Sequence, residues 1–488
     1  MYFKHLIFPD NITYSMLAND NIFRTYDIRG IVDKDLDVKG AYLIGCAVGT
    51  LLFEKLAKEN VTVVVGRDSR PSSGSLQSFF IEGLVAVGAD VIDIGVSLTP
   101  IVHFLTCTQD FDAGIEITAS HNPLSYNGFR LDYRNAVPFS SADIQEIRDK
   151  VRARNFEFNK GTKRKEDLNQ QYFSYIRDYF VFNKKHKVIL NCGHSTISEY
   201  ATETYGALNL DLTVINNEPE YGVDSVTPNP ENKFYMNSFK EVALSYDSSF
   251  ELGIALDPDC DRMGLIDEKG NSYSTDRLVQ AMLPYYLEGR SGKSLVVYDP
   301  KCSSYLHERV LSLGGSPRMI KTGHTFFSDA MHSGAVLGCE NSGHIYLDIN
   351  YGYDDGIFNS LYFLKMLEDL DISLFELMKG VQKSYTSGEI KIPVSDEKKF
   401  SVISGIVQNV KEQEANFYRV SYVDGVRVSL SEHSWFLIRV SNTTPNLTIL
   451  IELDNIDLLN EVHLMILSLL ASQGVDFIPL GEVELKQG

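Results

Sequence analysis

Residues 61–98 read VTVVVGRDSRPSSGSLQSFFIEGLVAVGADVIDIGVSL, and this stretch decides the predicted fold. The first five residues are a β-branched run, which is typical of a strand buried on both faces. A glycine and a proline break the run, after which we predict a helix over 75–89 and a second strand over 90–98. Another helix candidate (99–109) and another strand (113–118) follow. This alternation of strands and helices predicts a parallel α/β sheet.

The same layout occurs twice more along the chain. Hydrophobic strands are predicted at 187–192 and 294–299, and each is followed by a polar loop and a helix candidate. A different pattern begins near Glu389, with several strands and then one helix over about 456–472. We therefore expect three related α/β modules followed by a smaller α+β domain.

The composition is that of a globular protein, with 44% hydrophobic and 23% charged residues among 488. This length is too great for one ordinary core and indicates three or four domains. The net charge of −20 argues against nucleic acid as the main partner. A local group of arginines could still bind an anionic small substrate.

Six cysteines are scattered along the chain, and no pair has C-x-x-C spacing. We therefore expect neither a zinc ribbon nor a disulfide-rich scaffold, and we expect the protein to be in a reducing compartment. The N-terminal apolar run is too short for a signal peptide, and no run of about 18 apolar residues occurs. We expect a cytoplasmic protein that does not act at a membrane.

Three acidic residues, Asp257, Asp259 and Asp261, alternate within ELGIALDPDCDRMGLIDEKG (251–270). In an extended backbone this spacing directs all three carboxylates to one side. Such a group of like charges is costly unless a cation neutralises it. Oxygen ligands of this kind suit Mg²⁺ or Ca²⁺.

An EF-hand calcium loop is the main alternative for this segment, because Glu268 falls at position 12 when Asp257 is position 1. However, Arg262 stands at position 6, where the sharp turn needs glycine, and the flanking residues are typical of strands rather than helices. Three solvated loop acids are the other alternative. We prefer a magnesium site, because the acids follow a buried-type strand, where α/β proteins bind ligands.

Three other loops carry polar side chains that could take part in catalysis or bind a ligand. Ser120, in TASHNP, could be a turn residue, a nucleophile or the carrier of a transferred group, and the absence of a G-x-S-x-G elbow weakens a hydrolase interpretation. Glu340 and Ser342 could grip vicinal hydroxyls, and the loop from Arg439 to Pro445 could cradle a phosphate. Each of the last two loops could instead be an ordinary turn.

These motifs occur in a fixed order that covers nearly the whole chain. The chain resembles the α-D-phosphohexomutase family, specifically its bacterial phosphomannomutase/phosphoglucomutase group. The resemblance rests on FRTYDIRG (23–30), TASHNP (118–123), YNGF (126–129), TPNPEN (227–232), DPDCDR (257–262), KTGH (321–324), ENSGH (340–344), DDGI (354–357), DGVRV (424–428) and RVSNTTP (439–445).

The resemblance implies an α/β fold of four domains around a central cleft. Three domains would be related mixed-sheet α/β modules, and the fourth a smaller C-terminal α+β domain. The charged stretch over 160–170 marks the first boundary. The predicted domains carry the phosphoserine, metal-binding, sugar-binding and phosphate-binding loops in turn, over residues 1–163, 164–272, 273–388 and 389–488.

The resemblance also implies the reaction. A phosphohexomutase, an isomerase of carbohydrate metabolism, interconverts hexose 1-phosphate and hexose 6-phosphate through a phosphoserine enzyme and a 1,6-bisphosphate intermediate. The sugar would be mannose, glucose or both. The alternative within the family is phosphoglucosamine mutase. Outside it, the alternative is a catalytically inactive module that binds sugar phosphate or calcium, against which the intact serine, acids and phosphate loop argue.

The resemblance assigns roles to individual residues. Ser120 would be the phosphoserine. One Mg²⁺ per chain would be held by Asp257, Asp259, Asp261 and a phosphoserine oxygen. A hexose 1,6-bisphosphate would be the activator, phosphosugars the small-molecule partners, and the protein a monomer or a dimer. The sugar's O3 and O4 would be held by Glu340 and Ser342, and the non-reacting phosphate by Arg439, Ser441, Asn442 and Thr443. Other site residues would be Tyr26, Arg29, His121, Arg262, Lys301, His324 and His344.

Arg130 is a departure from the family, which commonly has lysine after YNGF. Lysine can shift its pKa and move a proton, whereas arginine stays charged. We therefore expect Arg130 to act as an electrostatic clamp and His324 and His121 to be the better candidates for proton transfer. Arg29 completes the predicted catalytic group.

Overall fold

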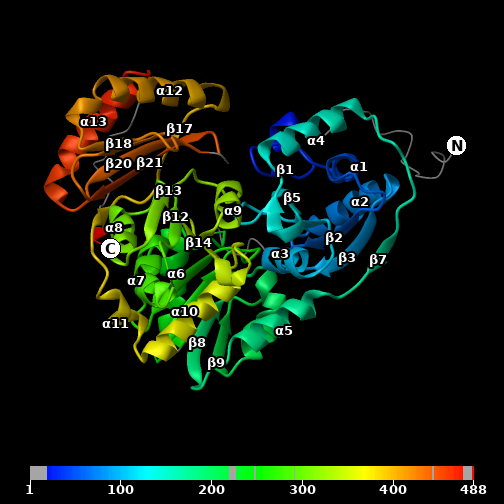
Figure 1. Ribbon diagram of the computed structural model, residues 1–488, viewed down its shortest axis with the longest axis horizontal. Helices are drawn as coiled ribbons and strands as arrows, with labels where there is room; N and C mark the ends of the chain where they lie inside the picture. The colour runs from blue at the N-terminus through cyan, green and yellow to red at the C-terminus, as the bar shows by residue number, and fades with distance from the viewer. Residues whose placement is uncertain are drawn as a thin grey trace.

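Four β-sheets follow one another along the chain and lie round an arc in Figure 1. The first sheet is at the right of the view, in blue and cyan, and the fourth is at the upper left, in orange and red. This computed structural model describes residues 19–218, 227–246, 249–290, 292–441, 444–475 and 486–487. The N-terminal extension before Asn19, and all but two residues of the C-terminal tail after Val475, lie outside this range.

The first module has a seven-stranded sheet with the order β1-β5-β4-β2-β3-β7, with β6 paired to β5. Its elements are β1 (Ile28–Ile31), α1 (Val38–Leu56), β2 (Thr62–Arg67), α2 (Ser73–Ala86), β3 (Asp90–Val96), α3 (Thr99–Thr108), β4 (Ala113–Ile117), β5 (Tyr126–Tyr133), β6 (Val137–Pro138), α4 (Ser141–Ala153) and β7 (Lys163–Lys165).

The predicted parallel arrangement of this sheet is correct for β2, β3 and β4 but not for the whole sheet. Strand β5 is antiparallel to β4, and β1 is antiparallel to β5. The reason is the short link over residues 118–125, because a parallel crossover needs a dozen or more residues. The sheet is therefore mixed, as in the predicted fold class.

The second and third modules repeat this design with four strands each, in the orders β11-β10-β8-β9 and β13-β12-β14-β15. In both, three strands are parallel and the last closes an antiparallel hairpin. The elements are α5 (Asn169–Tyr179), β8 (His186–Asn191), β9 (Leu210–Ile215), α6 (Lys233–Tyr246), β10 (Leu252–Leu256), β11 (Met263–Asp267), α7 (Thr275–Leu287), β12 (Leu295–Tyr298), α8 (Ser304–Ser312), β13 (Ser316–Met319), α9 (His324–His332), β14 (Ala335–Glu340), β15 (His344–Leu347), α10 (Gly356–Leu370) and α11 (Leu374–Met378).

The helix predicted after β8 is not a regular α-helix. The segment contains a short 3₁₀ turn, Thr196–Glu199, and a π-helical turn, Thr202–Gly206. It is rich in Ser and Thr, whose hydroxyls compete for backbone carbonyls: the Oγ1 of Thr204 donates to the carbonyl oxygen of Tyr200 at 2.7 Å. The prediction of an α-helix here was wrong for that reason.

The fourth domain has an antiparallel sheet with the order β18-β19-β20-β21-β16-β22, and β17 pairs with β21. Helices α12 and α13 lie together beside this sheet (Figure 1). Its elements are β16 (Tyr385–Thr386), β17 (Ile390–Pro393), α12 (Asp396–Glu412), β18 (Arg419–Ser421), β19 (Val426–Ser429), β20 (Trp435–Val440), β21 (Asn446–Leu453), α13 (Leu459–Ala471) and β22 (Lys486–Gln487).

Two short strands lie at the proposed domain boundaries. Strand β7 pairs with β3 of the first sheet and extends to Lys165, and β16 pairs with β21 of the fourth sheet from Tyr385 onward. Strand β7 thus crosses the proposed boundary after residue 163, and β16 lies before the proposed boundary after residue 388. Both boundaries remain proposals.

Apolar packing joins the first three modules more closely than the fourth. One cluster of buried side chains includes Phe104 of α3, Ile254 of β10 and Leu361 of α10, so it spans all three α/β modules. The fourth domain has a core of its own, which includes Phe436 and Ile466. The loops that end the strands of the first three sheets are therefore carried on one packed body.

Buried polar groups connect the fourth domain to the third. The guanidinium of Arg427 donates to the carbonyl oxygens of Pro300 at 3.0 Å and Cys302 at 2.9 Å, and lies 3.6 Å above the Trp435 ring. The hydroxyl of Ser303 donates to the carboxylate of Glu452. Burial, and then the charge of Asp276, raise the pKa of Glu452 to about 7 from an ordinary 4.5.

This pKa predicts a pH-dependent stability for the interface. The folded state keeps a proton on Glu452 that the unfolded state releases, so the free energy of unfolding falls as pH rises from 4.5 through about 7, by about 3 kcal/mol. Glu452→Gln, which keeps an acceptor for Ser303, is expected to raise Tm at pH 8 and to change it little at pH 5. Thermal unfolding at both pH values checks this, with exposed Glu157→Gln as the control. Equal changes at both pH values would contradict it.

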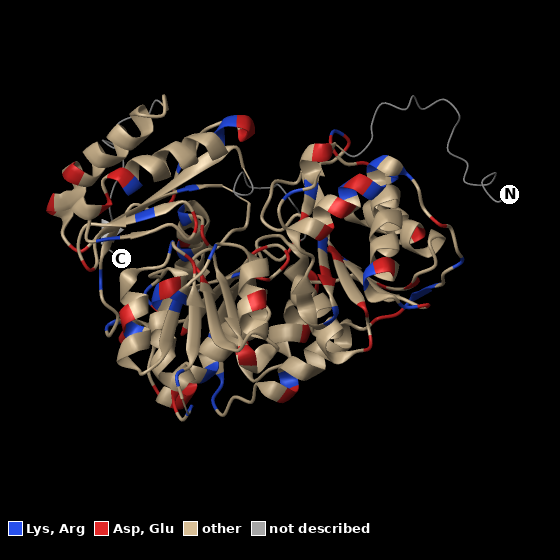
Figure 2. Cartoon of the chain, turned by 45° about the horizontal axis from the view of Figure 1, so that its top comes forward, with Lys and Arg blue, Asp and Glu red and all other residues tan. Residues whose placement is uncertain are grey.

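Charged residues of both signs are interspersed over the outer helices (Figure 2). Among the residues that the structure describes, no helix has the length and apolar character needed to cross a membrane.

Candidate active site

Three hairpin loops, each at the end of a parallel strand, carry the residues singled out by the sequence. They link β4 to β5, β10 to β11, and β14 to β15. Main-chain hydrogen bonds hold the second loop to the other two modules: Thr99 N, at the start of α3, donates to Asp259 O at 3.1 Å, and Met263 N donates to Gly343 O at 3.2 Å. The N-terminus of α10 also contacts the second loop, since Gly356 N donates to Cys260 O at 2.9 Å. A Cβ at Gly356 would lie 2.5 Å from the carbonyl oxygen of Arg262, so only glycine allows this approach.

Ser120 lies at the turn after β4 with a left-handed backbone, φ +48°. Its side chain is buried, and its Oγ donates to Oδ2 of Asp257 at 2.9 Å. Nδ1 of His121 lies 3.1 Å from the same Oγ, and the amide of Ser120 donates to Oγ1 of Thr118. The hydroxyl of the first module is therefore directed at the acidic loop of the second.

Asp257, Asp259 and Asp261 are all buried, and one oxygen from each lies within 4.8 Å of the others. Burial, and then the neighbouring carboxylates, raise the pKa of Asp257 and of Asp259. Oδ1 of Asp259 and Oδ1 of Asp261 are buried with no hydrogen-bond partner among the described residues. Two unpartnered oxygens within a group of three buried carboxylates fit a hard divalent cation such as Mg²⁺.

The EF-hand alternative is excluded by the flanking elements. The loop connects β10 and β11, which pair in register as an antiparallel hairpin. An EF-hand loop is flanked by two helices.

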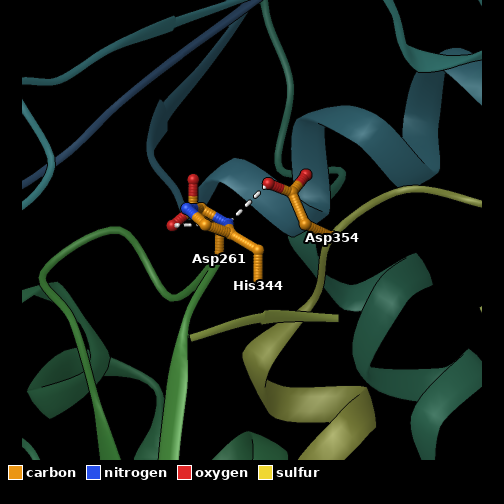
Figure 3. Close-up of side chains that lie close together, drawn as sticks. All are labelled: Asp261, His344 and Asp354. Carbon is orange, nitrogen blue, oxygen red and sulfur yellow. Dashed lines mark ion pairs between the residues drawn. The ribbon is translucent and has the colours of Figure 1, made fainter. Parts of the chain in front are cut away.

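A second charged group adjoins the acids and includes Asp261, His344 and Asp354 (Figure 3). Nδ1 of His344 is 2.9 Å from Oδ2 of Asp354 and 3.8 Å from Oδ1 of Asp261. Burial lowers the pKa of His344, but Asp261 and Asp354 outweigh it and raise the pKa overall. Asp261 therefore takes part in both groups.

Arg130 connects these two groups. Its Nη1 donates to Oδ2 of Asp261 at 3.0 Å, and its Nη2 to Oδ1 of Asp354 at 3.3 Å. Burial alone would lower the pKa of Arg130, but the charges of Asp354, Asp132 and Asp261 outweigh burial, and the pKa lies above its ordinary value. A guanidinium held in this way stays charged and cannot exchange a proton at working pH.

Two other histidines of the predicted site are uncharged near neutral pH. Desolvation, and then Arg262 and Arg29, hold the pKa of His121 well below its usual range. Desolvation, and then Arg130, do the same for His324. A neutral imidazole can accept a proton from a reacting hydroxyl.

The sugar-binding candidates lie in the loop between β14 and β15. Glu340 and Ser342 are buried, and the Ser342 hydroxyl donates to Oε1 of Glu340 at 3.1 Å. Lys301, in the loop after β12, is 3.4 Å from Oε1 of Glu231 and 3.2 Å from Oε1 of Glu389. Lys301 of the third module thereby contacts the second module through Glu231, and through Glu389 the segment that leads into the fourth domain.

The phosphate-binding candidates lie in the fourth domain. Nε of Arg439 donates to Oδ2 of Asp424 at 2.8 Å, while Nη2 is buried and lacks a hydrogen-bond partner in the described part of the chain. The Oγ of Ser441 is 2.8 Å from Oγ1 of Thr444. Asn442 and Thr443 lie outside the described residues. The unpartnered nitrogen of Arg439 fits an anionic ligand.

Tyr26 and the remaining predicted residues lie among these loops. The ring of Tyr26 is 5.6 Å from that of His324, and burial, and then Asp424, raise its pKa to about 12. Arg29 donates to Asn122 at 3.5 Å and pairs with Asp27. Nε of Arg262 is 3.7 Å from Oδ2 of Asp257. The tyrosine of the first module thus contacts the third and lies near the fourth.

Several residues of this site were not singled out by the sequence analysis. Asp354 holds both Arg130 and His344, Asp424 holds Arg439, and Glu231 holds Lys301. Each lies within a quoted motif, DDGI, DGVRV or TPNPEN, but local spacing gave it no role. Their partners lie on other loops, so only the folded chain pairs them.

Three family models match consecutive parts of this chain. They describe domains I, II and III of phosphoglucomutase/phosphomannomutase, each as alpha/beta/alpha, and match residues 20–158, 170–270 and 274–385. The chain belongs to this family. The matched ranges coincide with the three α/β modules, so the resemblance stated from the motifs is confirmed, as is the fold class of three such modules followed by a β-rich domain.

Curated relatives extend the phosphoglucomutase/phosphomannomutase match into the fourth domain. A phosphomannomutase/phosphoglucomutase of Pseudomonas syringae is 32% identical over 435 residues, covering 89% of this chain and 91% of that protein. A phosphoglucomutase of Neisseria meningitidis is 30% identical, and the alignment covers 90% of this chain and 94% of that protein. The crystal structure of a family protein from Burkholderia thailandensis has 27% identity and a TM-score of 0.82, covering 95% and 98%.

Proposed function

We propose that this protein is a phosphohexomutase that interconverts the 1-phosphate and 6-phosphate of mannose, glucose or both. The observation that carries the proposal is the 2.9 Å hydrogen bond from Ser120 Oγ to Asp257, at the point where the loops of three modules meet. The relatives named above are phosphomannomutases and phosphoglucomutases. These names do not favour phosphoglucosamine mutase, the alternative.

In the proposed reaction, Ser120 carries the phosphoryl group. The free hydroxyl of the bound phosphosugar attacks phosphorus in line as the bond from phosphorus to Oγ breaks. The hydroxyl proton passes to a neutral imidazole, for which His121 and His324 are the candidates. His121 lies 3.1 Å from Oγ and can also return a proton to it. A 1,6-bisphosphosugar results, and the reverse step at the other phosphate regenerates phospho-Ser120.

The acidic loop would hold the metal ion. Asp257, Asp259 and Asp261 supply the oxygens, and the two unpartnered oxygens among them fit one Mg²⁺ per chain. When bound, Mg²⁺ offsets the charge of about −1.5 to −2 on the phosphoserine and polarises the transferring group. Arg130 and Arg262 flank the acids and supply fixed positive charge beside them.

Substrate orientation would depend on two further loops. Glu340 and Ser342 would hold O3 and O4, which lie near the middle of the sugar ring, so the same grip serves both orientations of the sugar. Arg439, with Ser441, Asn442 and Thr443, would hold whichever phosphate is not reacting. Tyr26, Arg29, Lys301 and His344 would complete the site, and Arg130 would act as a clamp rather than a base.

The test is a coupled assay with Mg²⁺ and glucose 1,6-bisphosphate as activator, comparing mannose 1-phosphate, glucose 1-phosphate and glucosamine 6-phosphate. We expect turnover of one or both hexose phosphates in excess of glucosamine phosphate. Faster turnover of glucosamine 6-phosphate would support the alternative, and no turnover of any would contradict the proposal. Light scattering of the same sample decides between monomer and dimer.

A further inference from the structure

Arg70, in the loop after β2, is a buried arginine for which the proposed chemistry has no direct use. Its side chain is 1% exposed. Its donors point at the loop that carries Ser120: Nη1 donates to the carbonyl oxygens of Pro123 at 2.9 Å and Tyr126 at 3.1 Å. Nη2 donates to the carbonyl oxygens of Asn122 at 2.7 Å and of Ser120 itself. One guanidinium thus holds three carbonyls of the serine turn and the carbonyl of the first residue of β5.

The guanidinium is anchored on the other side by Asp68. Nε of Arg70 donates to Oδ2 of Asp68 at 3.1 Å, and the amide of Arg70 to Oδ1 at 3.1 Å. Asp68 also accepts a hydrogen bond from the hydroxyl of Ser73 at the start of α2. Its amide donates to the carbonyl oxygen of Ile117, at the end of β4. The anchor is therefore fixed to the same sheet that positions the serine.

The turn needs such a donor for two physical reasons. Its carbonyls converge on one buried point, and they would repel one another and lack partners without a multivalent donor. Ser120 also has a backbone φ of +48°, a conformation that residues other than glycine rarely adopt. The surrounding contacts must therefore hold the backbone of Ser120 in that conformation. The planar fork of arginine reaches several acceptors at once, whereas the ammonium of lysine does not.

We propose that Arg70 is a positioning residue for Ser120. Arg70 holds the turn so that the Oγ of Ser120 points at Asp257 through every phosphoryl transfer. The inference rests on the proposed function, because it assigns Arg70 to the serine that carries the phosphoryl group. Arg70 makes its contacts with the backbone of the turn, so it acts through Ser120 rather than on the substrate.

A positioning role predicts a distinctive kinetic result for Arg70→Lys. A displacement of about 1 Å at a reacting group can reduce the rate about 100-fold, so kcat is expected to fall by about that factor while KM changes little. Slow return of the phosphoryl group to Ser120 would also let the bisphosphate escape. The concentration of glucose 1,6-bisphosphate needed for half-maximal activity is therefore expected to rise, which a simple loss of stability would not cause.

Arg277→Lys is the matched control, since Arg277 is 7% exposed and donates to Ser384 rather than to the serine turn. It is expected to keep the activator requirement unchanged. A folded Arg70→Lys protein with the parent's kcat and activator requirement would overturn the inference. If Arg70→Lys does not fold, Ser73→Ala, which removes one anchor of Asp68, serves instead. An unchanged kcat and activator requirement in that variant would overturn the inference equally.

The proposed function can fail separately from this inference. A parent enzyme that is inactive on every phosphosugar would refute the function, and the inference with it. An active parent whose Arg70 variants retain its kinetics would refute the inference alone.

Discussion

Ser120→Ala is expected to lower kcat for hexose phosphate interconversion by about 10⁴-fold or more, because it removes the atom to which the phosphoryl group is attached. The turn should keep its shape, since alanine differs from serine only in lacking the hydroxyl and the four carbonyl contacts of Arg70 do not involve that group. Activator should not restore activity, because the variant cannot be phosphorylated at this position. Initial rates with and without glucose 1,6-bisphosphate measure both effects.

Ser360→Ala provides the matched control for that experiment. Ser360 is also buried, and its hydroxyl bonds to the carbonyl oxygen of Ile357 and to Tyr205, away from the acidic loop. It should retain most of the parent's kcat. A Ser120→Ala enzyme with more than a small fraction of the parent's activity would mean that another group carries the phosphate.

Asp259→Asn is expected to have the second largest effect, with opposite consequences for activity and stability. Loss of one oxygen ligand should weaken Mg²⁺ binding and lower kcat by roughly 10³-fold, the upper range for removing one transition-state charge contact. Without metal, however, the variant should be more stable than the parent. The carboxylates of the cluster repel one another: burial, and then that repulsion, raise the pKa of Asp257 and of Asp259.

Thermal unfolding in EDTA and in Mg²⁺ measures the stability part of this prediction. The parent should gain more Tm from Mg²⁺ than Asp259→Asn gains, and the variant should have the higher Tm in EDTA. Asp267→Asn is the control, because Asp267 is buried in the same hairpin but its oxygens bond to Tyr273 and Asn271. An Asp259 variant that gains as much from Mg²⁺ as the parent would show that the three acids do not hold the metal.

Much of the fold could be predicted because hydrophobic runs and their breaks are local signals. The strands at 61–65, 90–98 and 113–118 correspond to β2, β3 and β4, and the helices between them are present. The site loops were predictable for the same reason, since Ser120 and the three acids stand at the ends of buried strands. The hairpins that follow them reverse direction only because the links are short, which periodicity does not report.

The charge pairing of the site could not be predicted in the same way. Arg130 contacts Asp261 and Asp354, which are 131 and 224 residues away along the chain. Arg70 is 50 residues from Ser120 and bonds to its backbone, a contact that no spacing between side chains encodes. The contacts of Arg130 depend on how the modules pack against one another, and that of Arg70 depends on how two loops of the first module meet beyond β2 and β4. Neither follows from a local pattern.

The most direct measurement is the mass of the full chain after incubation with glucose 1,6-bisphosphate and Mg²⁺, followed by peptide mapping. We expect the mass increment of one phosphoryl group, located on the peptide that contains Ser120 and absent from Ser120→Ala. An active enzyme that carries no phosphate on Ser120, or carries it on another residue, would contradict the proposal that this hydroxyl transfers the phosphoryl group.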